Sequence, residues 1–354
     1  MAKSKAAEKI EEEADSLHPK LREHLIGFSA QEKQLLAMIN GKSLPHALLI
    51  TGQRGIGKAT LAYRVARFLL SPQEEATDSL FGDSLPPESL HIAHTHPTFK
   101  RVASGGHPDL LVLDGDDIKV EAARLVPEFL SLTPAESKWR VVIIDSVDVM
   151  NRNAANALLK ILEEPPAQAV LLLISHNPGA LLPTIRSRCR TFRMPKLGEQ
   201  DFAKILQEIA PEVEMYDYHQ WGVLSGYSPG IALTLIENKA DSLYKEILEL
   251  VHAPETLKLH TFADRFARKE NERNWKTFTY LVQWLISRIV ACGAAEVVEI
   301  FPGENQILKR LHLAKPLDTW TELWEKTGNL FYDTEHLHLD RKQAIITLIR
   351  AISE

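Results

Sequence analysis

Short apolar runs in the first half of the chain predict five strands of a parallel sheet. The runs are rich in Leu, Ile and Val, which is typical of strands that are buried on both faces. Helical patterns occupy the intervals between the runs, so the layout is that of an α/β sheet with crossover helices. The predicted strands span residues 46–51, 109–113, 140–145, 170–175 and 190–194.

Helical spacing of apolar residues is clear in two parts of the chain. Before the fourth strand, apolar residues recur at i, i+3, i+4 and i+7 from Ala155 to Leu162, and two prolines then stop that helix. After the fifth strand no further strand is indicated. The pattern there predicts an all-helical portion, with helical repeats in 274–290, 320–324 and 345–352.

Composition narrows the class of protein. The 354 residues are 45% apolar and carry a net charge of −6. This fits two or three globular domains and argues against a free-standing DNA-coating protein, which is normally basic. Two cysteines, Cys189 and Cys292, are too few for a disulfide framework or a cysteine zinc cluster. No signal peptide or membrane-spanning run is indicated, so we expect a cytoplasmic protein without membrane contact.

A candidate phosphate-binding loop follows the first predicted strand. Residues 52–58 match the pattern G-x-x-x-x-G-K, with a strand before them and a helix after them. Gly52, Gly55 and Gly57 let backbone N–H groups turn toward phosphate oxygens, and Lys58 reaches the outer phosphates. The pattern predicts a P-loop.

The residue after Lys58 departs from a working P-loop. That position normally carries Ser or Thr, whose hydroxyl binds Mg²⁺, but here it is Ala59. Thr60 comes one residue late, and one helical step rotates it by about 100°. The loop is therefore predicted to be degenerate. It keeps groups that could hold ATP or ADP but lacks the usual metal ligand.

The end of the third predicted strand departs in the same direction. Asp145 closes that strand and is followed by Ser146. In active ATPases of this architecture a Glu follows the Asp and activates the attacking water, and a serine cannot accept the proton as a carboxylate does. Asp148 lies two residues further on and is not an obvious substitute.

Two longer runs are more specific than the P-loop. One extends from 153 to 166 and ends in Glu-Glu-Pro-Pro, and the other extends from 184 to 190 and contains Ser-Arg-Cys. Ile26-Gly27, residues 45–48 and residues 107–109 fit the same pattern. With these motifs the sequence resembles the bacterial clamp-loader AAA+ subunits of the gamma/tau and delta-prime type. The resemblance covers residues 20 to 240 well and the helical remainder in general form.

The resemblance implies roles for the motifs. Residues 52–58 correspond to the Walker A loop and Asp145 to the Walker B acid. Ser175 falls at the sensor-1 position, where active subunits usually carry Thr. Residues 226–233 resemble the start of the sensor-2 helix, where active subunits place an Arg and this chain has Pro229-Gly230-Ile231.

Arg188 of the Ser-Arg-Cys motif matches the family's arginine finger, which reaches into the nucleotide site of the neighbouring subunit. The metal ligand, the catalytic Glu and the sensor-2 Arg are absent, whereas the residue used in trans is present. The resemblance therefore implies a delta-prime-type subunit that hydrolyses no ATP alone and needs no cofactor. Its implied partners are gamma/tau and delta subunits in a pentamer that places the sliding clamp on primed DNA within the DNA polymerase III holoenzyme.

On this resemblance we expect an α/β AAA+ fold, which is a RecA-like parallel sheet with flanking helices, followed by a small helical lid and an all-α collar domain. The expected ranges are a charged tail at 1–19, the α/β domain at 20–193, the lid at 194–243 and the collar at 244–354.

Many members of this family carry a four-cysteine zinc module between the P-loop helix and the second strand. This interval has no cysteine here. Without thiolates, and with a His-x-His spacing in a predicted loop, we expect no zinc or other metal. The interval holds four histidines instead: His91, His94, His96 and His107.

The sequence leaves three other functions to compare with this one. An ATP-hydrolysing clamp-loader subunit of the gamma/tau type is the main alternative, and Ala59 and Ser146 argue against it. A P-loop kinase for a small metabolite would leave the Ser-Arg-Cys motif and the helical C-terminal portion unexplained. A plain DNA-binding module is disfavoured because the chain has no basic stripe.

Overall fold

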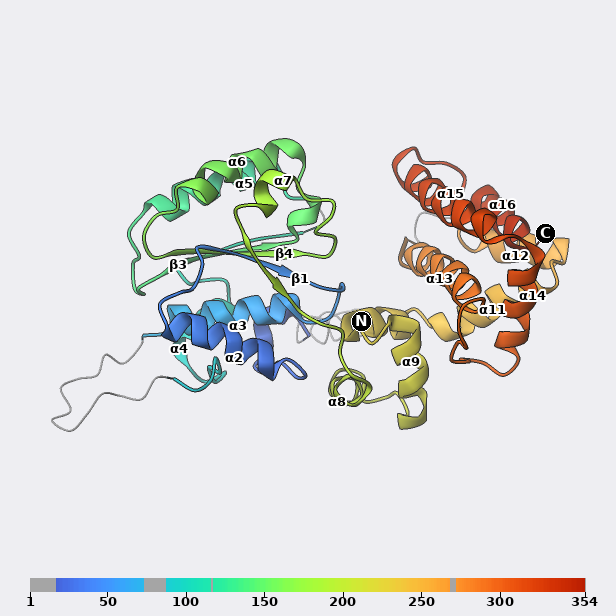
Figure 1. The fold of residues 1–354 in the computed structure, drawn as a ribbon, viewed down its shortest axis with the longest axis horizontal. Coiled ribbons are helices and arrows are strands. Elements are labelled where there is room, and N and C mark those ends of the chain that lie inside the picture. Colours follow the sequence, from blue (N-terminus) through green and yellow to red (C-terminus); the bar gives the residue numbers. More distant parts are fainter. Residues whose placement is uncertain (1–16, 73–86, 116, 268–271, 354) are drawn as a thin grey trace, which may run out of the picture. The chain divides into compact units, whose positions relative to one another are not determined.

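The computed structural model describes residues 17–72, 87–115, 117–267 and 272–353, which Figure 1 draws as a coloured ribbon. Most of the predicted charged tail, and residues 73–86 between the P-loop helix and the second strand, lie outside these residues. Contacts divide the chain into two compact units, Met1–Met215 with Gly226–Gly230 and Tyr216–Ser225 with Ile231–Glu354. The range 194–243 contributes to both units, and the division into three domains stays a prediction.

A five-stranded parallel sheet forms the centre of the first unit. Its order is β2-β3-β4-β1-β5, with every neighbouring pair parallel. The predicted α/β class is confirmed, and each predicted strand agrees with an observed one to within one residue. The bounds are β1 Ala47–Thr51, β2 Leu110–Asp114, β3 Arg140–Asp145, β4 Ala169–Ser175 and β5 Arg190–Arg193.

Helices cover both faces of the sheet (Figure 1). Successive strand residues point to opposite faces, so Leu48 and Ile50 of β1 pack with the helices of one face and Leu49 with those of the other. One face carries α2 Ser29–Asn40, α3 Lys58–Leu70 and α4 Pro97–Ala103, and the other carries α5 Val120–Ser131, α6 Arg152–Glu163 and α7 Pro183–Arg186. The unit also contains α8, Glu199–Ile209.

Every described element after β5 is a helix, as the spacing predicted. The longest helices bury their apolar residues against one another, with Trp275, Phe278 and Trp320 fully buried. The bounds are α9 Tyr218–Ser225, α10 Pro229–Glu237, α11 Ala240–His252, α12 Thr256–Asp264, α13 Glu272–Ala291, α14 Glu304–Ala314, α15 Leu317–His336 and α16 Arg341–Ser353, with short 3-10 turns at Pro19–Leu21, Val147–Val149 and Met215–Asp217.

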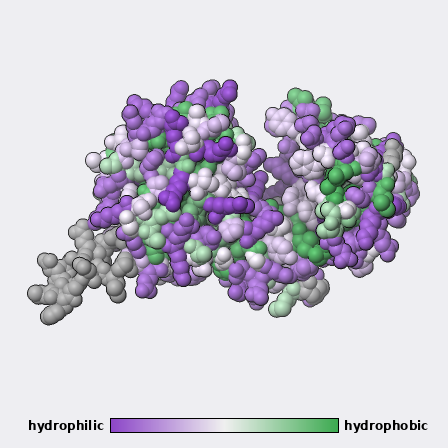
Figure 2. All heavy atoms as spheres, in the orientation of Figure 1, coloured by the Kyte–Doolittle hydropathy of each residue, from purple (hydrophilic) through white to green (hydrophobic). Residues whose placement is uncertain are grey.

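The surface of the helical portion keeps several large apolar side chains. Figure 2 shows hydrophobic atoms breaking the polar surface of this portion in several places. Leu313 is 83% exposed and Trp324 47% exposed. Exposed apolar side chains of this size are typical of surfaces that contact another protein. The others in the helical portion are Met215, Leu257, Val298, Leu317, Tyr332, Leu337 and Leu339.

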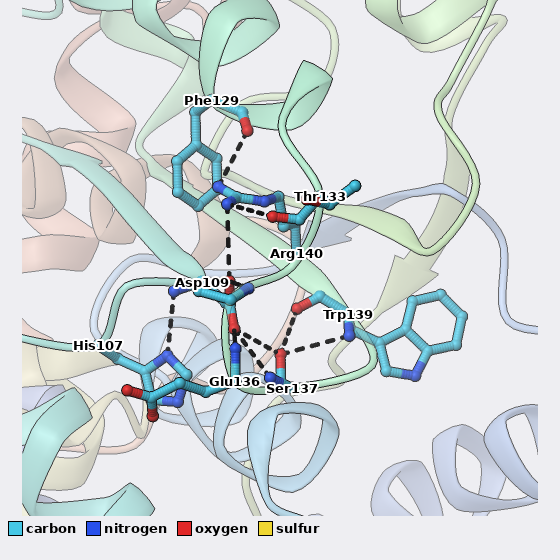
Figure 3. Close-up of polar contacts among 9 residues, drawn as sticks. His107, Asp109, Phe129, Thr133, Glu136, Ser137, Trp139 and Arg140 are labelled. Atoms are coloured by element: carbon cyan, nitrogen blue, oxygen red, sulfur yellow. Dashed lines mark hydrogen bonds and ion pairs between the residues drawn. The ribbon is translucent and has the colours of Figure 1, made fainter.

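A buried carboxylate, Asp109, fixes the loop that leads into β3 (Figure 3). It is fully buried, and Oδ1 accepts a hydrogen bond from Ala135 N at 2.6 Å while Oδ2 accepts from Glu136 N at 2.9 Å. Ser137 donates to Oδ2 through its N–H and its hydroxyl, each at 3.0 Å. Arg140, at the start of β3, has its Nη2 3.7 Å from Oδ1. These bonds set the position of the strand that ends in Asp145.

We expect Asp109→Asn to lower the free energy of unfolding by about 1–3 kcal/mol at pH 7, because an amide replaces one of the two accepting oxygens by an NH2 donor and leaves backbone N–H groups unpaired. Burial would raise the pKa of Asp109, but the hydrogen bonds from Ala135, Glu136 and Ser137 outweigh it and lower the pKa. The carboxylate therefore stabilises the fold above its unfolded pKa of about 3.9, and this contribution is lost as pH falls through the folded value. Urea unfolding of both proteins between pH 7 and pH 3 measures it.

The difference between Asp109→Asn and the wild type should be constant near neutral pH and shrink below about pH 4. Asp117→Asn, at an exposed carboxylate, serves as the control and should change stability by no more than about 0.5 kcal/mol. A difference that grew on acidification would contradict the depressed pKa.

Candidate functional site

The P-loop connects β1 to α3 at the carboxyl edge of the sheet. Its glycines have the backbone freedom that the pattern predicted, with φ of +154° at Gly52, +73° at Gly55 and +106° at Gly57. A Cβ at Gly52 would lie 2.8 Å from the carbonyl oxygen of Met194. Glycine is therefore needed at these positions for the loop to keep its shape.

The Lys58 ammonium is held by the loop itself. Nζ donates to the carbonyl oxygens of Gly52 at 2.8 Å and Gln53 at 2.7 Å. Burial lowers the pKa of Lys58 to about 8, although Asp145 and Asp148 act in the opposite direction. The side chain is thus a buried cation whose hydrogen bonds hold the start of the loop close to α3.

Asp145 and Ser175 lie at the same edge of the sheet as Lys58. In the register, Thr51 pairs with Ser175 and Asp145 pairs with Ile174, so the ends of β3, β4 and β1 stand side by side. Burial raises the pKa of Asp145, and the charge of Lys58 opposes this. The structure brings together all the residues predicted for the nucleotide site in cis.

Asp148 is the centre of this edge, which the sequence did not reveal. Its Oδ1 accepts from the Ser175 hydroxyl at 2.7 Å and its Oδ2 from the Ser146 hydroxyl at 2.9 Å. The backbone N–H of His176 also donates to Oδ2. Burial would raise the pKa of Asp148, but these hydrogen bonds outweigh it and lower the pKa.

These bonds decide what Asp148 and its partners can do. A carboxylate with a depressed pKa and occupied lone pairs is a weak general base. The hydroxyl of Ser175 donates its proton to the hydrogen bond with Asp148. His176 is also a weak base, because burial lowers its pKa to about 4. Asp148, which also accepts from Ser146, therefore bridges the ends of β3 and β4.

The residues of this edge fit phosphate groups better than a nucleotide with its metal. The P-loop retains its glycine conformations and its lysine, which are the groups that hold phosphate oxygens. At the position of the metal ligand, however, Ala59 offers no oxygen, and Thr60 is buried on α3. Mg²⁺ requires oxygen ligands in near-octahedral geometry, and the usual hydroxyl is missing.

The segment 226–230 packs directly on the P-loop. The Ser228 hydroxyl donates to the carbonyl of Arg54 at 2.6 Å, and Gly230 N donates to the carbonyl of Gly55 at 2.9 Å. A Cβ at Gly230 would lie 2.8 Å from Gly55 Cα. The backbone of this segment thus lies so close to the loop that a side chain at 230 would not fit in this arrangement.

Arg188 lies at the opposite edge of the sheet from the P-loop. It precedes β5, whose first residue, Arg190, pairs with Leu48 near the start of β1, whereas the P-loop follows Thr51 at the end of β1. Three residues of strand separate the two levels by about 10 Å. The structure therefore separates Arg188 from the other predicted site residues.

Arg188 has a partner that the sequence did not identify. Its Nη2 lies 2.5 Å from Oε1 of Glu163, the last residue of α6, and its Nη1 donates to the carbonyl of Thr184 at 3.0 Å. Burial raises the pKa of the neighbouring Cys189 to about 11, so that thiol is inert at neutral pH. The sequence does contain one indication of a basic partner for Glu163. Two glutamates stand together at a helix C-terminus, where negative charge is unfavourable with the helix dipole.

The four histidines between α3 and β2 differ in their contacts. His91 and His94 approach the Glu23 carboxylate at 3.2 and 2.9 Å. His107 instead accepts from Asp109 N through Nδ1 at 3.2 Å (Figure 3), and His96 caps α4 by accepting from Thr98 N. In the described ranges, no group of three or more His, Cys, Asp or Glu side chains is arranged to hold a metal ion.

No helix in the part of the chain that the structure describes is both long enough and apolar enough to cross a membrane.

A P-loop between the first strand and its crossover helix, in a parallel sheet that is followed in the described residues by helices only, is the architecture of AAA+-type P-loop proteins. Residues 28–198 match the family model described as DNA polymerase III, delta subunit. Over these residues the chain is similar to the delta subunits of DNA polymerase III.

The curated proteins that the chain resembles carry different subunit names. The chain is 36% identical over 203 residues to a DNA polymerase III subunit delta' of Pseudomonas aeruginosa, covering 56% of this chain and 58% of the relative. It is 32% identical over 238 residues to a subunit gamma of Buchnera aphidicola, covering 64% and 62%. A solved gamma subunit-related protein of Thermotoga maritima is 19% identical with a TM-score of 0.42, covering 91% of this chain and 98% of that one. The chain spans about 60% of the length of the two curated relatives.

Proposed function

We propose that this chain is a delta-prime-type clamp-loader subunit, which hydrolyses no ATP itself and completes the nucleotide site of a neighbouring ATPase subunit with Arg188. The observation that carries this proposal is the position of Arg188. It lies at the amino edge of the sheet, a strand length away from the P-loop of its own chain, and this separation supports a role at a nucleotide that another subunit holds.

The P-loop edge supports the other half of the proposal. Ala59 offers no metal ligand, Ser146 replaces the catalytic Glu, and Asp148 is engaged by hydrogen bonds from both neighbouring strand ends. The chain itself then needs no cofactor. Its P-loop, whose lysine is bonded to loop carbonyls, acts as a structural joint between α3 and the segment 226–230.

In trans, the chemistry would be electrostatic. An arginine beside a transferring γ-phosphoryl group stabilises the charge that develops on its oxygens in the transition state. The partners under this proposal are gamma/tau and delta subunits in a pentamer, and through that assembly the sliding clamp and primed DNA. The exposed apolar side chains of the helical portion, such as Leu313 and Trp324, support a collar of subunit contacts there. A cytoplasmic location follows from the same role.

Steady-state ATP hydrolysis tests the proposal most directly. We expect no turnover above background by the chain alone, and DNA-stimulated turnover by the chain combined with gamma/tau and delta subunits. The physical reason is that the lone chain lacks both the metal ligand and the base.

Steady turnover by the lone chain that disappears in Lys58→Ala would contradict the proposal. In that case Thr60 or Asp148 would have taken over a lost role, and the chain would be a hydrolysing subunit of the gamma/tau type. The Lys58→Ala variant therefore separates true activity of this P-loop from a contaminating ATPase.

A further inference from the structure

We propose that Glu163 is a positioning residue for Arg188, holding the guanidinium where it meets the anionic oxygens of a phosphate chain bound by the neighbouring subunit. This inference rests on the proposed role of Arg188. Its basis is the contact between Arg188 Nη2 and Glu163 Oε1 at 2.5 Å.

Residues of two helices contact the two Nη atoms of the guanidinium. Glu163 ends α6, and Thr184 lies in α7, where its carbonyl oxygen accepts from Arg188 Nη1 at 3.0 Å. Both helices are fixed to the core of the sheet, α6 through Leu162 and α7 through Ile185. Because anchored elements hold both Nη atoms, the Arg188 side chain is already restricted to few rotamers. It therefore loses less conformational entropy when it binds its target.

The contacts leave part of the guanidinium available. Arginine has five N–H donors in a planar fork, and the Nε–H and one Nη2–H point to the same side. Nε of Arg188 has no hydrogen-bond partner among the described residues, and 35% of the side chain is exposed. That side of the fork matches two oxygens of a phosphate group. A phosphate can therefore bind without displacing Glu163.

Glu163 lies at an electrostatically unfavourable position at the end of α6. Glu163 ends the helix and Glu164 caps it, although negative charge at a helix C-terminus is unfavourable. The ion pair with Arg188 offsets this for Glu163. Glu164, also exposed, shares the same helix end and charge, which makes it a matched control.

The test measures ATP hydrolysis by the complex of this chain with gamma/tau and delta subunits. We expect Glu163→Gln and Glu163→Ala to lower kcat about tenfold, because a mispositioned catalytic group costs up to about 100-fold. KM for ATP should stay unchanged, since the neighbouring subunit binds the nucleotide. Glu164→Gln should behave as the wild type.

A double variant shows whether Glu163 acts through Arg188. In the Arg188→Ala background, adding Glu163→Ala should cause no further loss, because two residues that serve one interaction are not additive. Thermal unfolding of each free chain, compared with Glu164→Gln, checks that the variants fold. A purely structural role of Glu163 would lower kcat by the same factor in both backgrounds.

The outcomes separate the two proposals. If Arg188→Ala lowers kcat and Glu163→Ala does not, the positioning role is wrong and the trans role of Arg188 stands. If Glu163→Ala raises kcat, Glu163 restrains the arginine instead of positioning it, which also overturns the inference. If Arg188→Ala itself leaves kcat unchanged, the proposed function fails, and the inference fails with it.

Discussion

Replacing Arg188 by alanine should lower ATP turnover at the neighbouring site by about 10³-fold or more while leaving the free chain folded. An arginine that stabilises a transferring phosphoryl group in trans is worth about 10³–10⁵ in rate. The side chain is partly exposed and its ion pair with Glu163 is at the surface, so its loss should cost no more than about 1 kcal/mol of stability.

The measurement is DNA-stimulated ATP hydrolysis by the complex, with single-turnover kinetics to isolate the site that faces this chain. Arg186→Ala is a suitable control, because Arg186 ends α7 two residues before Arg188, is exposed and donates to the carbonyl of Pro178 at 3.5 Å. Arg188→Lys should not rescue the rate, since an ammonium lacks the planar fork. Equal turnover in the alanine variant and the wild type would remove the trans role.

Replacing Glu304 by alanine should lower the free energy of unfolding of the helical unit by about 3–5 kcal/mol, because it leaves a buried charge without its partner. Glu304 is almost fully buried at the start of α14. Its Oε1 accepts from the Tyr244 hydroxyl at 2.6 Å and from Arg288 Nε at 2.9 Å, while Oε2 accepts from Ile300 N at 2.6 Å. One carboxylate thus joins α11, α13 and the turn before α14.

Urea unfolding of the full chain, followed by far-UV circular dichroism and tryptophan fluorescence, measures this loss. Trp284 stacks on Arg288 at 4.6 Å and reports on the network locally. The control is Glu322→Ala, which breaks an exposed pair with Lys326 and should cost less than about 1 kcal/mol. Losses of the same size in the two variants would show that the buried network contributes no more than a surface pair.

At the P-loop edge, contiguous motifs could be predicted from the sequence, whereas contacts between distant residues could not. The loop, its lysine and the strand that ends in Asp145 could be predicted because each is a contiguous run with a fixed spacing. The bridge formed by Asp148 could not, because its partner Ser175 is 27 residues away in the chain and comes near only when β3 and β4 pair. A carboxylate in a loop carries no periodic signal of the groups that will surround it.

The helical portion shows the same limit. Spacing in 274–290 predicted α13, because a helix repeats its apolar face every turn. That spacing gave no indication that Arg288 contacts Glu304 or lies in one network with Tyr244, because the three polar residues belong to three different helices. Polar residues bury only when their partners arrive together, so such a network follows from the packing of helices and not from any one helix.

By itself, the sequence determined the five strands, the helical remainder and the absence of a metal-binding hydroxyl at Ala59 and of a Glu at 146, because these depend on residue type and local order. Tertiary structure alone decided that Arg188 stands at the opposite edge from the P-loop and that Glu163 holds it. It also decided that 226–230 folds back onto the loop. Strand order and helix packing set these distances, and they arise from contacts between residues far apart in the chain.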